Sequence, residues 1–401
     1  MSSFVVALDV GGTSMKGGLV TRSGEIIRTD RRATPRDRGP AAVVATIRSF
    51  IDDLATAGGG TPAGVGLAVP GLVTADAALY SANIGWRDVP ATDFVPLDVP
   101  VILGHDVRTG GLAESVFGAG RELSDFLFLP IGTGIAGAVI LHGEPYGGSA
   151  GWGGEIGHTP VLPEGEPCAC GQIGCLETYA SASAVARRYS TRAPSSASST
   201  TIAPASTSTA PASTSTASTS TAPASTAPAS TAPASTAPAS TAPAFSITAS
   251  PDTTTTASAA SPTAASPATA TASPATAASP APVTAEQVAA LTASGDPLAM
   301  EIWGEAVEAL SPALATYTLL LDPSAIVLGG GLAEAGPLLS VPLAERLQKR
   351  LAFRDAPPLR QAALGMSAGM LGAALLGWRA AGFADAGATW SPDVLKSPRV
   401  A

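Results

Sequence analysis

The chain has few charged, aromatic and cysteine residues for its length of 401 residues. Only 13% of the residues are charged, 5% are aromatic and three are cysteines. So few cysteines, and an odd number of them, argue against a fold held together by disulfides. The formal net charge of −9 disfavours nucleic acid as a partner, because binding to phosphate backbones depends on lysine and arginine.

The apolar segments typical of exported or membrane proteins are also missing. No basic stretch precedes the first apolar segment, residues 4–8, so we expect no secretory signal and a cytoplasmic location. The longest apolar run, residues 362–378, contains four glycines and Ser367 and falls just short of a bilayer's thickness. A buried helix is expected there, and no contact with a membrane.

Residues 193–282 consist almost entirely of Ala, Ser, Thr and Pro, and include four consecutive copies of Ala-Pro-Ala-Ser-Thr. Such a tract has almost no large apolar side chains to bury, and its prolines interrupt helices and ladders. We therefore predict a disordered low-complexity insertion. Roughly 310 residues remain to form a core, which suits two domains of ordinary size.

The rest of the chain alternates between strand and helix patterns, which indicates an α/β fold. Strands are expected at residues 4–8, 16–20, 65–69, 101–103 and 326–328, and helices at 40–57, 110–117, 297–321 and 337–351. Thr284 and Gln287 form a capping-box pattern. A second strand–turn–strand unit, residues 126–141, resembles the first. We infer two similar cores that face one another across a cleft.

The first turn, between residues 9 and 16, has the parts of a phosphate-binding hairpin. Gly11 and Gly12 let backbone N–H groups approach a phosphate, and Thr13 offers a hydroxyl. Lys16 adds a positive charge, and Asp9 adds a carboxylate that could hold magnesium. An ordinary glycine hairpin is the alternative.

Gly132, Thr133 and Gly134 form a second turn of this kind. The segment formally matches a dinucleotide fingerprint, but residues 138–141 predict a strand where that fingerprint needs a helix. No P-loop motif occurs anywhere in the chain. A second phosphate-contacting turn is the interpretation that fits.

His105 and Asp106 follow a short apolar strand, at an edge where ligands bind in open α/β sheets. Phosphoryl transfer to an alcohol needs a carboxylate that accepts the hydroxyl proton, and Asp106 is our candidate for this base. Capping of the following helix is its alternative role. His105 is either a hydrogen-bond donor to the ligand or a structural histidine.

All three cysteines, Cys168, Cys170 and Cys175, lie within eight residues, and His158 precedes the first by ten positions. One histidine and three cysteines are a common ligand set of closed structural zinc sites, so we expect a structural Zn²⁺ without an open position for catalysis. Unmetallated thiols in a glycine-rich loop are the alternative.

Glu155 and Glu177 bracket these four residues. Carboxylates held by a rigid metal loop are good hydrogen-bond acceptors for a polyhydroxylated ligand, so the segment suggests a sugar site with a metal brace. Exposed acids are common, and simple surface carboxylates remain the alternative.

Together these motifs resemble the ROK family of bacterial sugar kinases and repressors, most closely its glucokinase-like members. The resemblance covers nearly all of the chain outside the low-complexity tract, and the cysteine run is its most specific part. It also rests on Pro70-Gly71, Asn83-Ile84-Gly85-Trp86, Gly154-Glu155-Ile156-Gly157-His158 and Gly329-Gly330-Gly331.

The resemblance implies an actin-like ATPase fold of two ribonuclease-H-like domains, expected at residues 1–117 and 118–401, with the metal loop at residues 154–177. It implies phosphorylation of a hexose, with glucose favoured, at its 6-hydroxyl by ATP with Mg²⁺. Asp106 is the implied general base. The implied sugar contacts are Gly71, Asn83, His105, Asp106, Glu155, His158 and Glu177. Those implied near phosphate, magnesium or adenosine are Asp9, Gly11, Gly12, Thr13, Lys16, Gly132, Thr133, Gly134, Gly330 and Gly331.

Alternatives follow from the same resemblance. Many hexose-specific members carry Asn where this chain has His105, so an N-acetylmannosamine or N-acetylglucosamine kinase is a rival. A non-catalytic sugar-sensing protein is another, although family regulators carry a helix-turn-helix domain ahead of the first turn and only eight residues precede Asp9 here. Polyphosphate is a less expected donor, because the chain is acidic. The family also implies a homodimer or a higher homo-oligomer.

Overall fold

The computed structural model describes residues 3–193, 283–388 and 390. The tract predicted to be a disordered insertion therefore lies, apart from Ala193, outside the described residues. The described residues belong to one compact unit.

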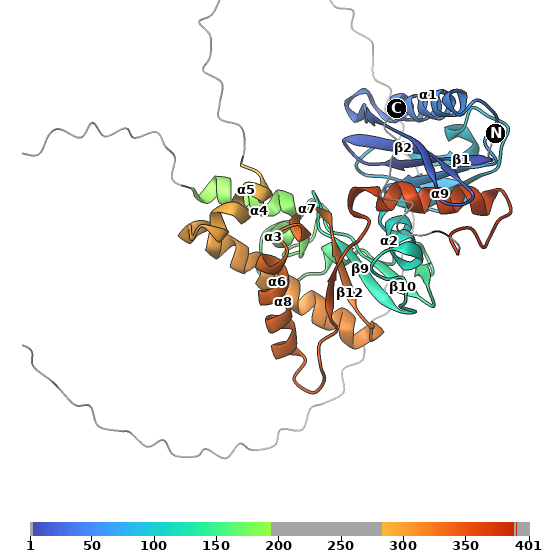
Figure 1. The fold of residues 1–401 in the computed structure, drawn as a ribbon. Coiled ribbons are helices and arrows are strands. Elements are labelled where there is room, and N and C mark those ends of the chain that lie inside the picture. Colours follow the sequence, from blue (N-terminus) through green and yellow to red (C-terminus); the bar gives the residue numbers. More distant parts are fainter. Residues whose placement is uncertain (1–2, 194–282, 389, 391–401) are drawn as a thin grey trace, which may run out of the picture. The chain divides into compact units, whose positions relative to one another are not determined.

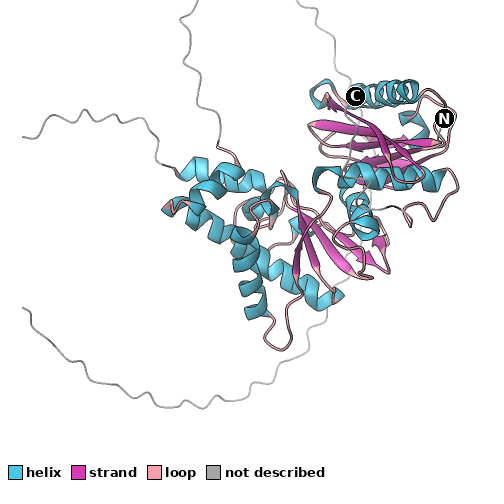
Figure 2. Cartoon of the chain, in the orientation of Figure 1, coloured by secondary structure: helices cyan, strands magenta, loops and turns pink. Residues whose placement is uncertain are grey.

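The first sheet is built largely from the N-terminal part of the chain, and its strand order is β3-β2-β1-β4-β8 (Figures 1 and 2). Its strands are β1 (Phe4–Val10), β2 (Ser14–Thr21), β3 (Ile26–Ala33), β4 (Val65–Val69) and β8 (Val101–His105). The first three strands pair antiparallel, whereas β1, β4 and β8 run parallel.

The second sheet repeats this pattern with the order β11-β10-β9-β12-β13. Its strands are β9 (Phe126–Pro130), β10 (Ala138–Leu141), β11 (Glu144–Tyr146), β12 (Ile326–Gly329) and β13 (Leu359–Gln361). Again three strands are antiparallel, and β9, β12 and β13 are parallel. The expectation of two similar cores is thereby confirmed, while the division of the chain at residue 117 stays a prediction.

Helices cover both faces of each sheet. The helices are α1 (Pro40–Gly58), α2 (Asp106–Phe117), α3 (Glu177–Ala180), α4 (Ala182–Arg192), α5 (Ala285–Ala293), α6 (Pro297–Leu321), α7 (Gly330–Ala333), α8 (Pro337–Arg350) and α9 (Ala368–Ala380). Apolar side chains of α1 pack on one face of the first sheet, and those of α9 pack on the other. In the second sheet, α6 and α8 share a core with β9 and β12.

Smaller elements complete the fold. A three-stranded sheet consists of β5 (Leu72–Val73), β6 (Ala77–Tyr80) and β7 (Arg87–Pro90). Single 3₁₀ turns occur at Arg36–Arg38, Ala91–Phe94, Ile156–His158 and Gly365–Ser367.

Most sequence expectations hold, and the differences lie at element ends. Helix α6 spans the predicted residues, because Asp296 caps it and Pro297 occupies the first turn. The capping box at Thr284 is present. Helix α2 begins at Asp106 and not at Gly110, because the side chain of His105 caps it by accepting from the N–H of Arg108. The apolar run at residues 362–378 contributes the buried helix α9.

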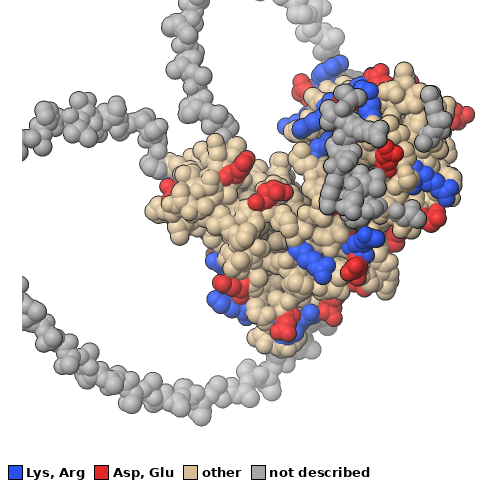
Figure 3. Space-filling view, viewed as in Figure 1, with Lys and Arg blue, Asp and Glu red and all other residues tan. Residues whose placement is uncertain are grey.

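Charged side chains are sparse on the surface. In the face drawn in Figure 3, most of the surface is neither acidic nor basic, in keeping with the low content of charged residues. None of the described helices combines the length and the apolar character that a membrane crossing requires.

Helix α9 approaches β4 so closely that their backbones touch. A Cβ atom added to Gly66 would lie 1.8 Å from the carbonyl oxygen of Ala373, and one added to Gly372 would lie 2.0 Å from that of Thr109 in α2. Glycine at these two positions therefore lets α9 lie against both the first sheet and α2.

Replacing Gly66 tests this contact. We expect Gly66→Ala to push α9 off β4 and to lower the free energy of unfolding by about 3 kcal/mol, in the range of overpacked cores. Denaturant titration measures the loss. Gly60→Ala is the matched control, because a Cβ atom at Gly60 meets no atom within 4 Å, and equal stability of the two variants would refute the argument.

Candidate functional site

One cavity collects the residues expected to contact a sugar. This cavity, which we name the polar cavity, has a volume of about 540 Å³. Its lining includes every predicted sugar contact and the whole second turn: Gly71, Asn83, His105, Asp106, Glu155, His158, Glu177, Gly132, Thr133 and Gly134. The polar cavity thus joins loops from both sheets with the predicted metal loop.

A second cavity of about 550 Å³ lies next to it, and we name it the glycine cavity. Asp9 and Lys16 line it from the first sheet, and Gly330 and Gly331 line it from α7. Asp106 lines both cavities, together with Val107 and Pro130. The candidate base therefore stands where the two cavities meet.

Gly11, Gly12 and Thr13 line neither cavity. The N–H of Gly11 donates to the carbonyl of Ser14, and Thr34 binds the turn twice, through its N–H to Thr13 and through its hydroxyl to Gly11. A Cβ atom at Gly12 would meet no atom within 4 Å, so the tip of the turn faces open space. The structure fixes the shape of this turn, and the phosphate contact of its three residues stays a prediction.

His105 lies between two carboxylates at the end of β8. Its Nδ1 is 3.3 Å from Oδ1 of Asp106, and its Nε2 is 4.0 Å from Oε1 of Glu155. Burial lowers the pKa of His105, although the two carboxylates oppose this change. His105 thus caps α2 and lines the polar cavity, and a hydrogen bond from it to a ligand stays a prediction.

Arg108 lies outside both cavities but supports a loop of the site, and the sequence did not reveal it. It is buried, and its guanidinium donates to the carbonyl oxygens of Gly151 and Gly153 at 2.9 and 3.0 Å. This contact ties the helix that begins with Asp106 to the loop that carries Glu155. Nothing in the local pattern distinguishes such an arginine from an exposed helical one.

Glu177 fixes the second turn. Its Oε2 accepts from the N–H of Ile135 at 2.8 Å, and a Cβ atom on Gly134 would lie 2.4 Å from the same oxygen. The N–H of Ala182 donates to Gly132 at 2.8 Å. The start of α3 and α4 thereby positions residues 132–134 against the polar cavity.

The four predicted metal ligands come together. The ligand atoms of His158, Cys168, Cys170 and Cys175 all lie within 4.8 Å of one another. Nδ1 of His158 is 3.8 Å from Sγ of Cys168, and the sulfurs of Cys170 and Cys175 are 3.7 Å apart. Tetrahedral zinc with Zn–S bonds of about 2.3 Å places its ligand atoms at about this spacing. The arrangement fits one four-coordinate ion.

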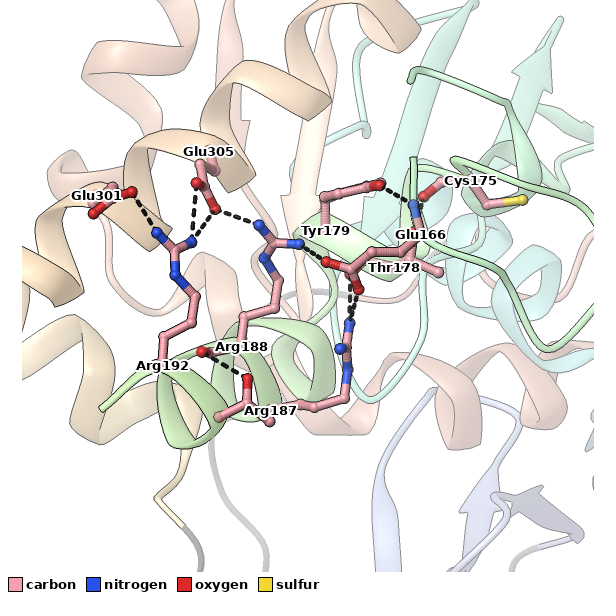
Figure 4. A network of polar contacts seen from close by, with 10 residues as sticks. Glu166, Cys175, Thr178, Tyr179, Arg187, Arg188, Arg192, Glu301 and Glu305 are labelled. Carbon is pink, nitrogen blue, oxygen red and sulfur yellow. Dashed lines mark hydrogen bonds and ion pairs between the residues drawn. The ribbon is translucent and has the colours of Figure 1, made fainter. Parts of the chain in front are cut away.

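A network of ion pairs ties this metal loop to α4 and α6 (Figure 4). Glu166 of the loop accepts from Arg187 at 2.7 Å and also from Arg188. Arg188 and Arg192 both bind Glu305 of α6. Although partial burial acts in the opposite direction, these two guanidinium groups lower the pKa of Glu305. Ion pairs thus hold the loop of the predicted metal ligands against α4 and α6.

Removal of two thiols tests the metal site. We expect the purified protein to contain about one zinc ion per chain and the Cys168→Ser/Cys170→Ser variant to contain none, as measured by elemental analysis. Gln172→Ala is the control, because this amide lies 3.4 Å from the sulfur of Cys170 without belonging to the ligand set. Zinc retained in the double variant would contradict the four-ligand site.

The pKa of Asp9, which lines the glycine cavity, is raised well above its ordinary value. Burial raises the pKa of Asp9 to about 6, the negative charge of Asp106 adds to the rise, and Lys16 opposes it. Folded Asp9 therefore holds its proton more tightly than the unfolded chain does. At a pH above about 6, ionisation of Asp9 therefore destabilises the ligand-free fold.

We therefore expect Asp9→Asn to unfold with a free energy about 3 kcal/mol higher than the unaltered protein at pH 8. The difference should shrink as the pH falls below 6 and vanish below 3.8, the ordinary pKa of the group. Denaturant titrations at several pH values measure it without ligands. Asp52→Asn, at an exposed position of α1, is the control, and a difference that does not depend on pH would count against the argument.

Comparison with known proteins agrees with this geometry. The sequence model of the ROK family matches residues 5–232 and 259–379. The glucokinase of Halalkalibacterium halodurans is 37% identical over 190 residues, 45% of this chain and 58% of the relative. The chain thus spans less than two thirds of this relative. The glucokinase of Streptomyces coelicolor is 25% identical, and the alignment covers 92% of this chain and 96% of that glucokinase.

Regulators and solved structures match as well. The xylose repressor of Bacillus subtilis is 29% identical over 197 residues, 48% of this chain and 51% of the repressor. Among solved structures, this chain resembles a ROK family glucokinase from Streptomyces griseus in complex with glucose and AMPPNP. The TM-score is 0.65 at 23% identity, and the match covers 94% of this chain and 100% of that glucokinase chain. These similarities, with the repeated sheet pattern, establish the actin-like ATPase fold.

Proposed function

The chain belongs to the ROK family, and we propose that it is a kinase that transfers the terminal phosphoryl group of ATP to the 6-hydroxyl of a hexose, with glucose favoured. The place of Asp106 carries this proposal. A group that lines two adjoining cavities can meet an acceptor hydroxyl in one and the end of a phosphate chain in the other. The glucokinases among the relatives support the same activity.

The polar cavity is the proposed acceptor site. Glu155 and Glu177 offer carboxylate oxygens to sugar hydroxyls, and Asn83 offers an amide. With Nδ1 of His158 directed to the metal cluster, its other ring nitrogen remains for the sugar. Asp106 accepts the proton of the 6-hydroxyl as that oxygen forms its bond to phosphorus and ADP leaves.

The glycine cavity is the proposed donor site. The backbone at Gly330 and Gly331 can approach a nucleotide closely, and Lys16 brings a positive charge. Asp9 has the carboxylate chemistry that Mg²⁺ prefers. Burial and, second, the negative charge of Asp106 raise the pKa of Asp9, and a bound cation would favour its ionised form against both. Bound Mg²⁺ supplies charge stabilisation of the phosphates.

Two other functions have observations in their favour. His105, which stands where many hexose-specific members carry Asn, lies between Asp106 and Glu155, so an N-acetylmannosamine or N-acetylglucosamine kinase is the nearest alternative acceptor specificity. The xylose repressors among the relatives favour a sugar-sensing protein without catalysis.

A substrate panel with one variant separates these functions. We expect ATP and Mg²⁺ to support phosphorylation of glucose above other hexoses and N-acetylhexosamines, measured by coupled release of ADP. Asp106→Ala should lower turnover by about 10²- to 10⁴-fold, the usual contribution of a general base, and should still bind the sugar in calorimetry.

Asp98→Ala, which removes an exposed carboxylate that lines neither cavity, is the control and should keep full turnover. No phosphorylation of any sugar in the panel would refute the kinase proposal. Unchanged turnover in Asp106→Ala would remove Asp106 as the base.

A further inference from the structure

Three charged residues form a row across the first sheet, starting inside the glycine cavity. Asp9 of β1 lies directly opposite Lys16 of β2, and Lys16 lies directly opposite Arg31 of β3. Residues directly opposite one another in antiparallel strands point to the same face of the sheet. The row therefore places a carboxylate, an ammonium and a guanidinium side by side, from the interior of the sheet to its edge strand.

The face of this row is the one that α9 covers. A Cβ atom on Gly18, two residues after Lys16, would lie 2.7 Å from the sulfur of Met370 in α9, whereas one on Gly17 would lie 2.7 Å from Leu54 in α1. Lys16 and Arg31 thus belong to the α9 side of the sheet. Consistent with this, Nζ of Lys16 donates to the carbonyl of Met366, a residue that also lines the glycine cavity.

Arg31 lies beside the first turn, where its guanidinium contacts Ser14. Its guanidinium donates to the hydroxyl of Ser14 at 2.9 Å. Among the described residues, neither Arg31 nor Lys16 forms an ion pair with a carboxylate. Two like charges directly opposite one another on a sheet are unfavourable by themselves. An anion bound between Lys16 and Arg31 would attract both positive charges and relieve their mutual repulsion.

The neighbouring arginine shows a different arrangement. Arg32 points to the other face, where its guanidinium lies 4.4 Å from the centre of the Phe50 ring and forms an ion pair with Asp53 of α1. Arg32 therefore has a carboxylate partner, whereas Arg31 has none among the residues that the structure describes. Along β3, the strand alternation places an ion-paired arginine on one face and, on the other, an arginine whose guanidinium donates to the Ser14 hydroxyl.

We propose that Arg31, together with Lys16, binds the phosphate chain of the donor at the mouth of the glycine cavity. The ligand class is a linear phosphoanhydride chain, which ATP and inorganic polyphosphate share. The proposal rests on the proposed kinase function and adds a binding residue to it. Arg31 suits this role because a planar guanidinium can donate two parallel hydrogen bonds to phosphate oxygens.

Direct binding tests the proposal without requiring turnover. Calorimetry with Mg²⁺ compares ATP, tripolyphosphate and adenosine on the intact protein, Arg31→Gln and Arg32→Gln. We expect Arg31→Gln to weaken the binding of ATP and of tripolyphosphate by at least about tenfold each, because charge-assisted hydrogen bonds to phosphate are lost, and to leave the binding of adenosine unchanged. Arg32→Gln, from the opposite face of the same strand, should bind all three like the unaltered protein.

Kinetics then separate the possible donors. In Arg31→Gln the KM for the donor should rise about tenfold while the KM for the sugar stays the same. Assays with ATP and with inorganic polyphosphate show which of the two is the phosphoryl donor. A higher KM of Arg31→Gln for that donor supports the proposed site. Arg31→Lys should recover part of the loss, since it keeps the charge but not the paired donors.

Two results would overturn the proposal. One is an unchanged affinity of Arg31→Gln for tripolyphosphate, and the other is an equal loss in Arg32→Gln, which would indicate damage to the strand. If Arg31-dependent binding of the phosphate chain is present but no sugar is phosphorylated, the kinase function fails and this site stands. If turnover is present but independent of Arg31, only the site fails.

Discussion

The backbone contact between α9 and β4 determines where the two critical carboxylates lie. Because Gly66 has no side chain, α9 lies directly on the first sheet, and its first turn brings Gly369 against the carboxylate of Asp9. The other side of α9 touches α2 at Gly372, and α2 begins with Asp106. A helix late in the sequence thus contacts both the strand that carries Asp9 and the helix that begins with Asp106.

The chain has few charges, and several of them are concentrated at this site. Burial and Asp106 raise the pKa of Asp9, and Lys16 opposes that rise, so the ligand-free site holds negative charge at a cost to stability. Strain of this kind is expected at a functional site and is compensated by packing elsewhere. The proposed acceptor side differs, because the cluster of four predicted metal ligands and the network around Glu166 and Arg188 lie beside it.

Local patterns predicted the parts of this architecture that depend on neighbours in sequence. The turn at Gly11, the cysteine run and the capping box of α5 each lie within a short segment, so spacing revealed them. The early start of α2 was missed because it depends on the side chain of His105, which caps the helix by accepting from the N–H of Arg108. Arg108 and Arg31 depend on partners distant in sequence or on strand register, which no local pattern contains.

The undescribed tract joins two helices, α4 and α5, that lie away from both cavities. Helix α4 ends at Arg192 and α5 begins at Ala285, and both contribute to the core around α6 through Val185 and Val288. Neither helix lines the polar or the glycine cavity. The free energy of closing a loop grows only slowly with its length, so helices anchored in this way can accept a long insertion. Ion pairs between Arg192 and Glu305 strengthen the anchor of α4 on α6.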